Sequence, residues 1–212
     1  MIDQPLSDII RYCLQFSSQP DEILIELERE THLKTMSPQM MTGPLQGQLL
    51  SILSHMKNPE NILEIGTFTG YGTICLARGL SVSGKVYTIE INREMKIINH
   101  AFFKKAGIAD RVVYLEGDAK EILPTLDLLF DIVYIDAAKQ DYGFYYQTIK
   151  NKMNKGGIIL ADNVLWSGKV LQPNKDKETT AIQAFNEMIA NDEEVKAVIL
   201  PVRDGLTVIR IL

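Results

Sequence analysis

The sequence has few residues of the types that cross-link small proteins or bind metals through sulfur and nitrogen. Its 212 residues include only two cysteines and three histidines. Cys13 and Cys75 lie in apolar stretches and match no CxxC or metal-finger spacing, so we expect two small buried side chains in a reducing compartment. Neither a disulfide scaffold nor a zinc finger is indicated.

Positive charge and long apolar runs are also scarce. The chain carries 22 lysines and arginines against 27 acidic residues, a net charge of −5, with no basic run. Broad nucleic-acid binding depends on clustered cations, so this balance argues against it. No stretch approaches the roughly 18 apolar residues of a membrane helix, and the first residues lack a basic leader. We therefore expect a cytoplasmic protein that binds neither nucleic acid nor membrane.

Hydrophobic residues make up 46% of the chain, enough for one well-buried domain over residues 1–212. Residues 1–58 are expected to form a helical cap and residues 59–212 the core. The first helix is indicated by apolar residues on one helical face: Leu6, Ile9, Ile10, Cys13 and Leu14. Further helices are predicted from Asp21 to His32 and from Leu45 to His55. The loop between them is rich in methionine, and Met36 and Met41 are candidates for an adaptable binding surface.

After residue 60 the chain alternates between short β-rich runs and helical stretches of 8 to 15 residues. The predicted strands are Asn61–Ile65, Lys85–Ile91, Arg111–Glu116, Asp131–Ile135, Gly157–Ala161, Val195–Pro201 and Leu206–Ile211. Such alternation is typical of a mostly parallel sheet with helices on both faces. The last two strands are joined by Arg203-Asp204-Gly205, which indicates a hairpin. The prediction is an α/β, doubly wound, Rossmann-like sheet of seven strands with a terminal antiparallel hairpin.

Ligands of such sheets bind beyond the carboxyl ends of the strands, where the strand order reverses. The first strand leads into Gly66-Thr67-Phe68-Thr69-Gly70-Tyr71-Gly72, and this glycine spacing differs from the G-x-G-x-x-G of dinucleotide enzymes. Glu64, just before the loop, is expected either to bind the amino end of a cofactor or to orient the loop backbone. Glu90 ends the second strand, where an acid accepts hydrogen bonds from ribose hydroxyls. Asp118 follows the third strand and is a candidate for adenine binding, for a helix N-cap, or for both.

Two further strand ends carry a set of oxygen ligands. Asp136 ends the fourth strand, and Asp162 and Asn163 end the fifth. If these strands are neighbours, two carboxylates and an amide converge, which suits Mg²⁺, Mn²⁺ or Ca²⁺. Lys139 would lie beside that cation and act as a general base. Trp166 follows closely and is a candidate either for the core or for contact with an aromatic acceptor.

Three segments together resemble the catechol and caffeoyl-CoA type of O-methyltransferase, a class I S-adenosylmethionine family: Glu64-Ile-Gly-Thr-x-Thr-Gly-Tyr, Asp136-Ala-Ala-Lys139 and Asp162-Asn163-Val-Leu-Trp166. The resemblance covers about residues 36–211. It implies S-adenosylmethionine as cofactor, bound by Thr42, Glu64, Gly66, Phe68, Gly70, Tyr71, Gly72, Glu90, Ile91, Asp118, Ala119 and Asp136. It also implies a divalent cation held by Asp136, Asp162 and Asn163, catalysis by Lys139 and Asp136, and an acceptor bound by Met36, Met41, Lys139 and Trp166.

The implied reaction is methylation of a small vicinal-dihydroxy aromatic whose hydroxyls chelate the cation, which lowers the phenolic pKa. Animal catechol enzymes carry a glutamate shortly before the final Asp-Gly turn, whereas residues 198–201 here hold no carboxylate. The resemblance is therefore to the bacterial and plant branch, whose members are usually dimers.

Three other functions fit parts of the pattern. A nicotinamide-dependent oxidoreductase requires the missing G-x-G-x-x-G and leaves the oxygen cluster unexplained. A nucleic-acid methyltransferase requires a basic face and, for adenine, an Asn-Pro-Pro run where Asn163 is followed by Val164. A non-catalytic cofactor-binding module would not need Lys139.

Overall fold

The computed structural model describes residues 6–173 and 176–212. Its strands are β1 (Asn61–Ile65), β2 (Lys85–Glu90), β3 (Val112–Glu116), β4 (Phe130–Ile135), β5 (Met153–Asp162), β6 (Val195–Leu200) and β7 (Leu206–Ile211). Each predicted strand is present, and β5 starts at Met153 rather than at Gly157. The central strands are nearly continuous apolar runs, as expected for strands buried on both faces of a sheet.

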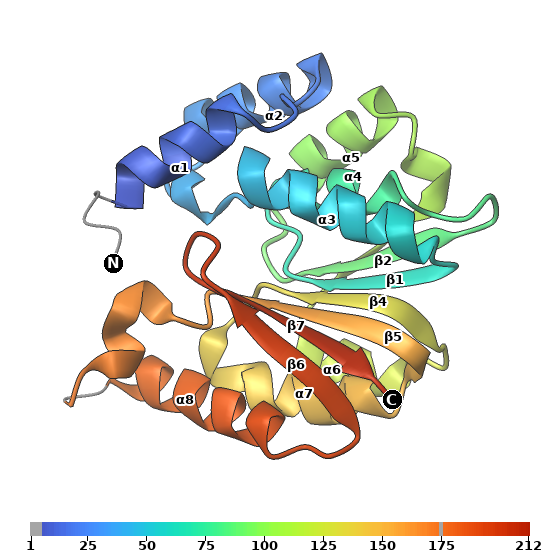
Figure 1. The fold of residues 1–212 in the computed structure, drawn as a ribbon. Helices are drawn as coiled ribbons and strands as arrows, with labels where there is room; N and C mark the ends of the chain where they lie inside the picture. The colour runs from blue at the N-terminus through green and yellow to red at the C-terminus, as the bar shows by residue number, and fades with distance from the viewer. Residues whose placement is uncertain (1–5, 174–175) are drawn as a thin grey trace.

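The strands form one sheet in the order β3-β2-β1-β4-β5-β7-β6 (Figure 1). β1 to β5 pair in parallel, while β7 is antiparallel to both β5 and β6. The predicted mixed sheet with a terminal hairpin is therefore confirmed. The order reverses between β1 and β4, whose last paired residues are Ile65 and Ile135. A ligand crevice is expected beyond these two residues.

Helices cover both faces of the sheet (Figure 1). The elements on one side are α1 (Leu6–Gln15), α2 (Glu22–Lys34), α3 (Pro44–Lys57), α4 (Tyr71–Ala77) and α5 (Met95–Lys105). On the other side lie α6 (Ala119–Ile122), α7 (Tyr142–Lys150) and α8 (Lys177–Ala190). The predicted boundary of the helical cap, at residues 58 and 59, falls between α3 and β1, and the division into cap and core stays a prediction.

Two connecting helices are shorter than the 8 to 15 residues expected: α4 has seven residues and α6 has four. After α6 the chain continues as a 3-10 turn, Leu123–Thr125, which contains Pro124. Proline lacks a backbone N–H and cannot continue an α-helix, so the helical stretch is cut short.

Each face of the sheet has its own apolar core. One cluster joins Ile62 and Leu160 to Leu27 and Phe102 of the α2 and α5 side. The other joins Leu63 and Ile159 to the α7 and α8 side. Alternate residues along a strand point to opposite faces, so each strand contributes to both cores.

The prediction that both cysteines are buried is wrong for Cys13. Cys75 is buried as predicted, but Cys13 is exposed. Helix α1 packs against α3 at the margin of the helical layer, where Ile10 and Leu14 are only half-buried. An apolar helical face therefore does not guarantee burial of every residue on it. None of the helices within the described residues is long and apolar enough to cross a membrane.

Candidate functional site

A cavity of about 980 Å³ opens at the carboxyl ends of β1, β2, β4 and β5. Most of the predicted site residues line it: Met36, Met41, Thr42, Gly66, Phe68, Tyr71, Glu90, Ile91, Asp118, Ala119, Asp136, Lys139, Asp162, Asn163 and Trp166. Glu64, Gly70 and Gly72 are not among the lining residues. The strand ends therefore bring the separate sequence motifs together around one space.

Glu64 lies behind the glycine loop and is 1% exposed. Its carboxylate accepts hydrogen bonds from the hydroxyls of Thr73 and, at 2.6 Å, of Thr88. Burial raises the pKa of Glu64 to about 8. Both contacts are with side chains, on α4 and β2, so the two roles open for Glu64, orientation of the loop backbone and contact with a cofactor, stay predictions.

Gly66 lets the loop approach β4 closely. Its φ is +99°, and a Cβ placed there would lie 2.0 Å from the carbonyl oxygen of Asp136. Gly66 N–H donates to the carbonyl of Ile89, while Asp136 N–H donates to that of Ile65. Only glycine fits this position, so the loop and the end of β4 are fixed relative to each other.

Phe68, at the turn of the loop, adopts a left-handed backbone with φ +47°. Its N–H donates to Glu90 at 2.7 Å, and its carbonyl accepts from Asn99 Nδ2 at 3.0 Å. The N–H of Asn92 donates to the second oxygen of Glu90 at 2.8 Å. Burial raises the pKa of Glu90, while these backbone donors stabilise its ionised form. Glu90 is thus a fixed acceptor at the cavity wall.

Asp118 caps helix α6, because its carboxylate accepts from the N–H of Lys120 at 2.8 Å. The predicted N-cap is confirmed. The residue also lines the cavity, so its other oxygen lone pairs are placed for a ligand; adenine recognition by Asp118 stays a prediction.

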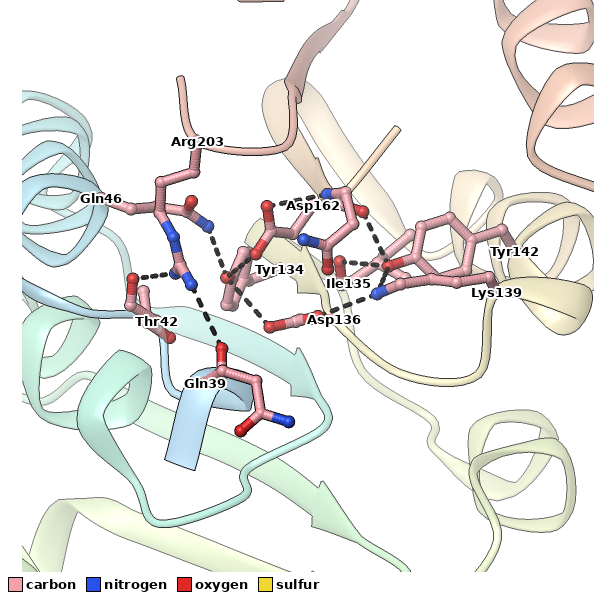
Figure 2. Close-up of polar contacts among 11 residues, drawn as sticks. Gln39, Thr42, Gln46, Tyr134, Ile135, Asp136, Lys139, Tyr142, Asp162 and Arg203 are labelled. Carbon is pink, nitrogen blue, oxygen red and sulfur yellow. Dashed lines mark hydrogen bonds and ion pairs between the residues drawn. The ribbon is translucent and has the colours of Figure 1, made fainter. Parts of the chain in front are cut away.

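The acids that end β4 and β5 face a buried phenol (Figure 2). The Tyr134 hydroxyl lies 3.2 Å from Asp162 Oδ2 and 3.5 Å from Asp136 Oδ2. Gln46 Nε2 donates to the same hydroxyl at 2.8 Å. Burial and the charge of Asp136 raise the pKa of Asp162 to about 6, while hydrogen bonding from Gln46 and the charge of Lys139 act in the opposite direction.

Lys139 is only 8% exposed. Its Nζ lies 3.0 Å from Asp136 Oδ1 and donates to the Tyr142 hydroxyl at 2.8 Å. The Tyr142 hydroxyl lies 3.0 Å from the carbonyl of Asp162 and 3.2 Å from that of Ile135, so it can donate to either (Figure 2). The amine is therefore held at the oxygen cluster by two contacts, one with Asp136 after β4 and one with Tyr142 at the start of α7.

The residues present fit a hard divalent cation. No cluster of three His, Cys, Asp or Glu side chains occurs within the part of the chain that the structure describes. A cation here would thus be bound by two carboxylates and the amide oxygen of Asn163, which lines the cavity in a left-handed conformation with φ +59°. All-oxygen ligation suits Mg²⁺, Mn²⁺ or Ca²⁺ and would relieve the repulsion between Asp136 and Asp162.

Five residues of the site escaped the sequence analysis: Gln46, Asn99, Tyr134, Tyr142 and Arg203. Tyr134 could have been found, because it lies two residues before Asp136, which directly follows β4, and the two-residue period of extended chain points both side chains the same way. From the sequence, Arg203 is predicted only as part of a hairpin turn. Its guanidinium donates to the carbonyls of Thr42 and Gln39, and it lines the cavity.

Comparisons with known proteins agree with this geometry. A family model described as O-methyltransferase matches residues 14–212. Tricin synthase 2 of Oryza sativa subsp. japonica is 37% identical over 81% of this chain, a match that spans 63% of that relative's length. Caffeoyl-CoA O-methyltransferase of Stellaria longipes is 33% identical over 94% of this chain and 88% of its own.

A solved structure with the same fold is the O-methyltransferase TomG of Streptomyces achromogenes, involved in Tomaymycin synthesis and solved in complex with SAM. It has a TM-score of 0.89, 31% sequence identity and coverage of 96% of both chains. These findings leave no place for a nicotinamide-dependent oxidoreductase. The chain belongs to the O-methyltransferase family, alongside caffeoyl-CoA O-methyltransferases, and is a SAM-dependent O-methyltransferase.

Proposed function

We propose that this enzyme methylates one hydroxyl of a small vicinal-dihydroxy aromatic, of catechol or caffeoyl type, with the help of a divalent cation. One observation carries the proposal: Asp136 and Asp162, which line the cavity at the ends of neighbouring strands, both lie within 3.5 Å of the buried Tyr134 hydroxyl. The names of the caffeoyl-CoA relatives support the acceptor class.

Asp136, Asp162 and Asn163 would hold the cation. When bound, a divalent cation acts as a Lewis acid that lowers the pKa of an adjacent acceptor hydroxyl. The carboxylates supply most of the opposing charge, and the Tyr134 hydroxyl orients them from the buried side. Mg²⁺ is the ion we expect, with Mn²⁺ or Ca²⁺ as substitutes, because the ligands are all oxygen.

Lys139 Nζ would receive the proton of the attacking hydroxyl. Its contact with Asp136 Oδ1 at 3.0 Å places it beside the candidate cation ligands, and the Tyr142 hydroxyl fixes it from the other side. A base held within hydrogen-bond reach of the reacting oxygen typically contributes about 10²–10⁴-fold to the rate.

The rest of the cavity would hold SAM, which supplies the methyl group. Glu90 would accept from the ribose hydroxyls, Asp118 and Ala119 would adjoin the adenine, and Thr42 would contact the amino-acid end. Met41 and Trp166 would flank the acceptor ring, and the buried Trp166 Nε1 has no hydrogen-bond partner within the described residues. These residues act by positioning, which contributes much of the rate in such transfers.

A screen with isotope-labelled SAM tests the proposal. We expect 3,4-dihydroxy aromatics to be methylated with Mg²⁺ and not in excess chelator, and Asp136→Asn to lose activity in the same assay. Asp127→Asn is the matched control, because Asp127 is exposed and does not line the cavity. Full activity in chelator would rule out the cation, and equal turnover of monohydroxy aromatics would rule out the acceptor class.

We also infer a cytoplasmic homodimer. Exposed apolar side chains on the N-terminal helices, and on the turn that follows α1, support an interface there: Tyr12, Phe16, Ile25, Ile52 and Met56. Sedimentation equilibrium of the full chain measures the mass, and a monomer at micromolar concentration would contradict the inference.

A further inference from the structure

Cationic side chains that line the cavity are paired with carboxylates in three cases: Lys34 with Glu30 at 2.6 Å, Lys120 with Asp141 at 3.3 Å and Lys139 with Asp136 at 3.0 Å. Arg203 is different. Within residues 6–173 and 176–212, no carboxylate forms an ion pair with it. Its charge is thus available to a ligand in the cavity.

The guanidinium of Arg203 is fixed in place without being neutralised. One terminal nitrogen donates to the carbonyl of Thr42, and the other lies 3.5 Å from the carbonyl of Gln39 (Figure 2). Carbonyl oxygens carry no net charge, so these contacts order the side chain but leave its positive charge uncompensated. The remaining N–H groups form a planar donor set that suits a carboxylate or phosphate.

Arg203 is close enough to the oxygen cluster to act on the same acceptor. Arg203 lines the same cavity as Asp136, Asp162 and Lys139. In Figure 2 the Arg203 guanidinium and the Lys139 amine lie on opposite sides of the Asp136–Asp162 pair. A ring whose hydroxyls face the acids and Lys139 can therefore extend its substituent toward Arg203.

We propose that Arg203 binds an anionic group on the acceptor, a carboxylate or a phosphate, and so sets the preference of this enzyme for charged over neutral dihydroxy aromatics. The inference rests on the proposed function and specifies its substrate class. Both sources of negative charge present oxygen atoms to the guanidinium in the same way, so the experiment must separate them.

Three acceptors with one common ring provide the test: 3-(3,4-dihydroxyphenyl)propanoate, its neutral amide and its coenzyme A thioester. The saturated linker keeps the charge from altering the phenolic pKa. We expect kcat/KM of the wild-type enzyme to be about tenfold higher for the acid, the thioester or both than for the amide. A preference for the acid alone would show that Arg203 binds the carboxylate. A preference for the thioester alone would show that it binds the phosphates.

Arg203→Gln should bring the ratio of kcat/KM for the anionic acceptors to kcat/KM for the neutral amide close to one. Arg203→Lys should give an intermediate ratio, because the ammonium keeps the charge but not the planar donor set. The ratio is the readout, since any displacement of residues 39–42 affects all three acceptors alike. Lys120→Gln, which removes another cation from the cavity wall, should keep the wild-type ratio.

Equal kcat/KM for all three acceptors in the wild type, or an unchanged ratio in Arg203→Gln, would overturn the proposal. Calorimetric binding of the acid and the amide to protein loaded with S-adenosylhomocysteine and Mg²⁺ gives the same comparison without turnover. Absence of methyl transfer would then contradict the proposed function, while the binding ratio still decides the role of Arg203.

Discussion

Gln46 Nε2 donates to the Tyr134 hydroxyl at 2.8 Å, although the two residues lie 88 positions apart in the chain. Gln46 is on α3 and Tyr134 on β4, and both are fully or nearly fully buried. Burial and the nearby acids raise the pKa of Tyr134 well above its usual value, so its hydroxyl keeps its proton. That single proton can go to Asp162 or to Asp136, while Gln46 occupies an acceptor site of the oxygen.

Tyr134→Phe removes only this hydroxyl. We expect the affinity for Mg²⁺ to fall about 10-fold or more, as is usual when a hydrogen-bond partner of a metal ligand is lost. Calorimetric titration of Mg²⁺ into protein loaded with S-adenosylhomocysteine measures this directly. Tyr146→Phe is the matched control, because its buried hydroxyl bonds to Asp192 at 2.8 Å, outside the cavity lining. An unchanged Mg²⁺ affinity in Tyr134→Phe would show that the phenol does not orient the acids.

Lys139→Met keeps the length of the side chain and removes the amine. We expect kcat to fall about 10²–10⁴-fold because the proton acceptor is lost, while the affinity for S-adenosylhomocysteine stays within about twofold. Steady-state kinetics and calorimetry separate the two effects. Lys96→Met is the control, since Lys96 is exposed and paired with Glu116 at 3.2 Å. A fall in cofactor affinity equal to the fall in kcat would point to a binding role instead.

Asn99→Ala removes the side chain that donates a hydrogen bond to the carbonyl of Phe68, the residue with the left-handed backbone. The Phe68 carbonyl loses its donor at 3.0 Å, so the glycine loop, whose Phe68 N–H donates to Glu90, becomes less ordered. Loss of one such hydrogen bond costs about 1 kcal/mol, which corresponds to roughly a fivefold weaker binding of S-adenosylhomocysteine. Asn191→Ala, at the end of α8, removes a comparable exposed hydrogen bond and should not affect binding.

Glu64 predicts a pH-dependent stability of the cofactor-free protein. Its pKa is raised from 4.5 to about 8, mainly by burial. Between these pH values the folded protein keeps a proton that the unfolded chain has released, so stability from this group is fully present below about pH 4.5 and is lost as the pH rises toward 8. Glu64→Gln mimics the protonated acid. Its free energy of unfolding should therefore rise relative to that of the wild type by at most about 1.4 kcal/mol for each unit by which the pH increases.

Urea unfolding of wild type and Glu64→Gln at pH 5, 6, 7 and 8 measures this divergence. Glu193→Gln, on an exposed residue, serves as the control. Parallel stability curves for Glu64→Gln and the wild type across these pH values would mean that Glu64 is ionised in the folded state.

The sequence predicted the parts of the site that are local in the chain. Asp162 and Asn163 are adjacent, Lys139 follows Asp136 by three residues, and each pair ends a strand whose apolar run is easily recognised. Parallel neighbours bring such strand ends together, so their convergence follows from the topology alone. The terminal hairpin was predictable for the same reason, because its two strands are joined by a three-residue turn, whereas the strand order comes from the structure.

Contacts between distant elements were not predictable in this way. Gln46 meets Tyr134 only because α3 packs on the sheet, and Arg203 reaches Thr42 across 161 positions. The exposure of Cys13 depends on where α1 lies at the edge of the helical layer. Periodicity identifies a face of an element, but the neighbour that covers that face is decided by tertiary packing.

The position of the antiparallel β7 near the end of the chain also determines when the cavity can be completed during translation. It inserts between β5 and β6, and the turn before it supplies Arg203 to a cavity whose other walls precede it in the chain. During translation the loop at residues 39–42 emerges about 160 residues before its guanidinium partner, and a contact of such long range forms late in folding. A nascent chain therefore carries the glycine loop and the acids well before Arg203 can complete the wall of the cavity.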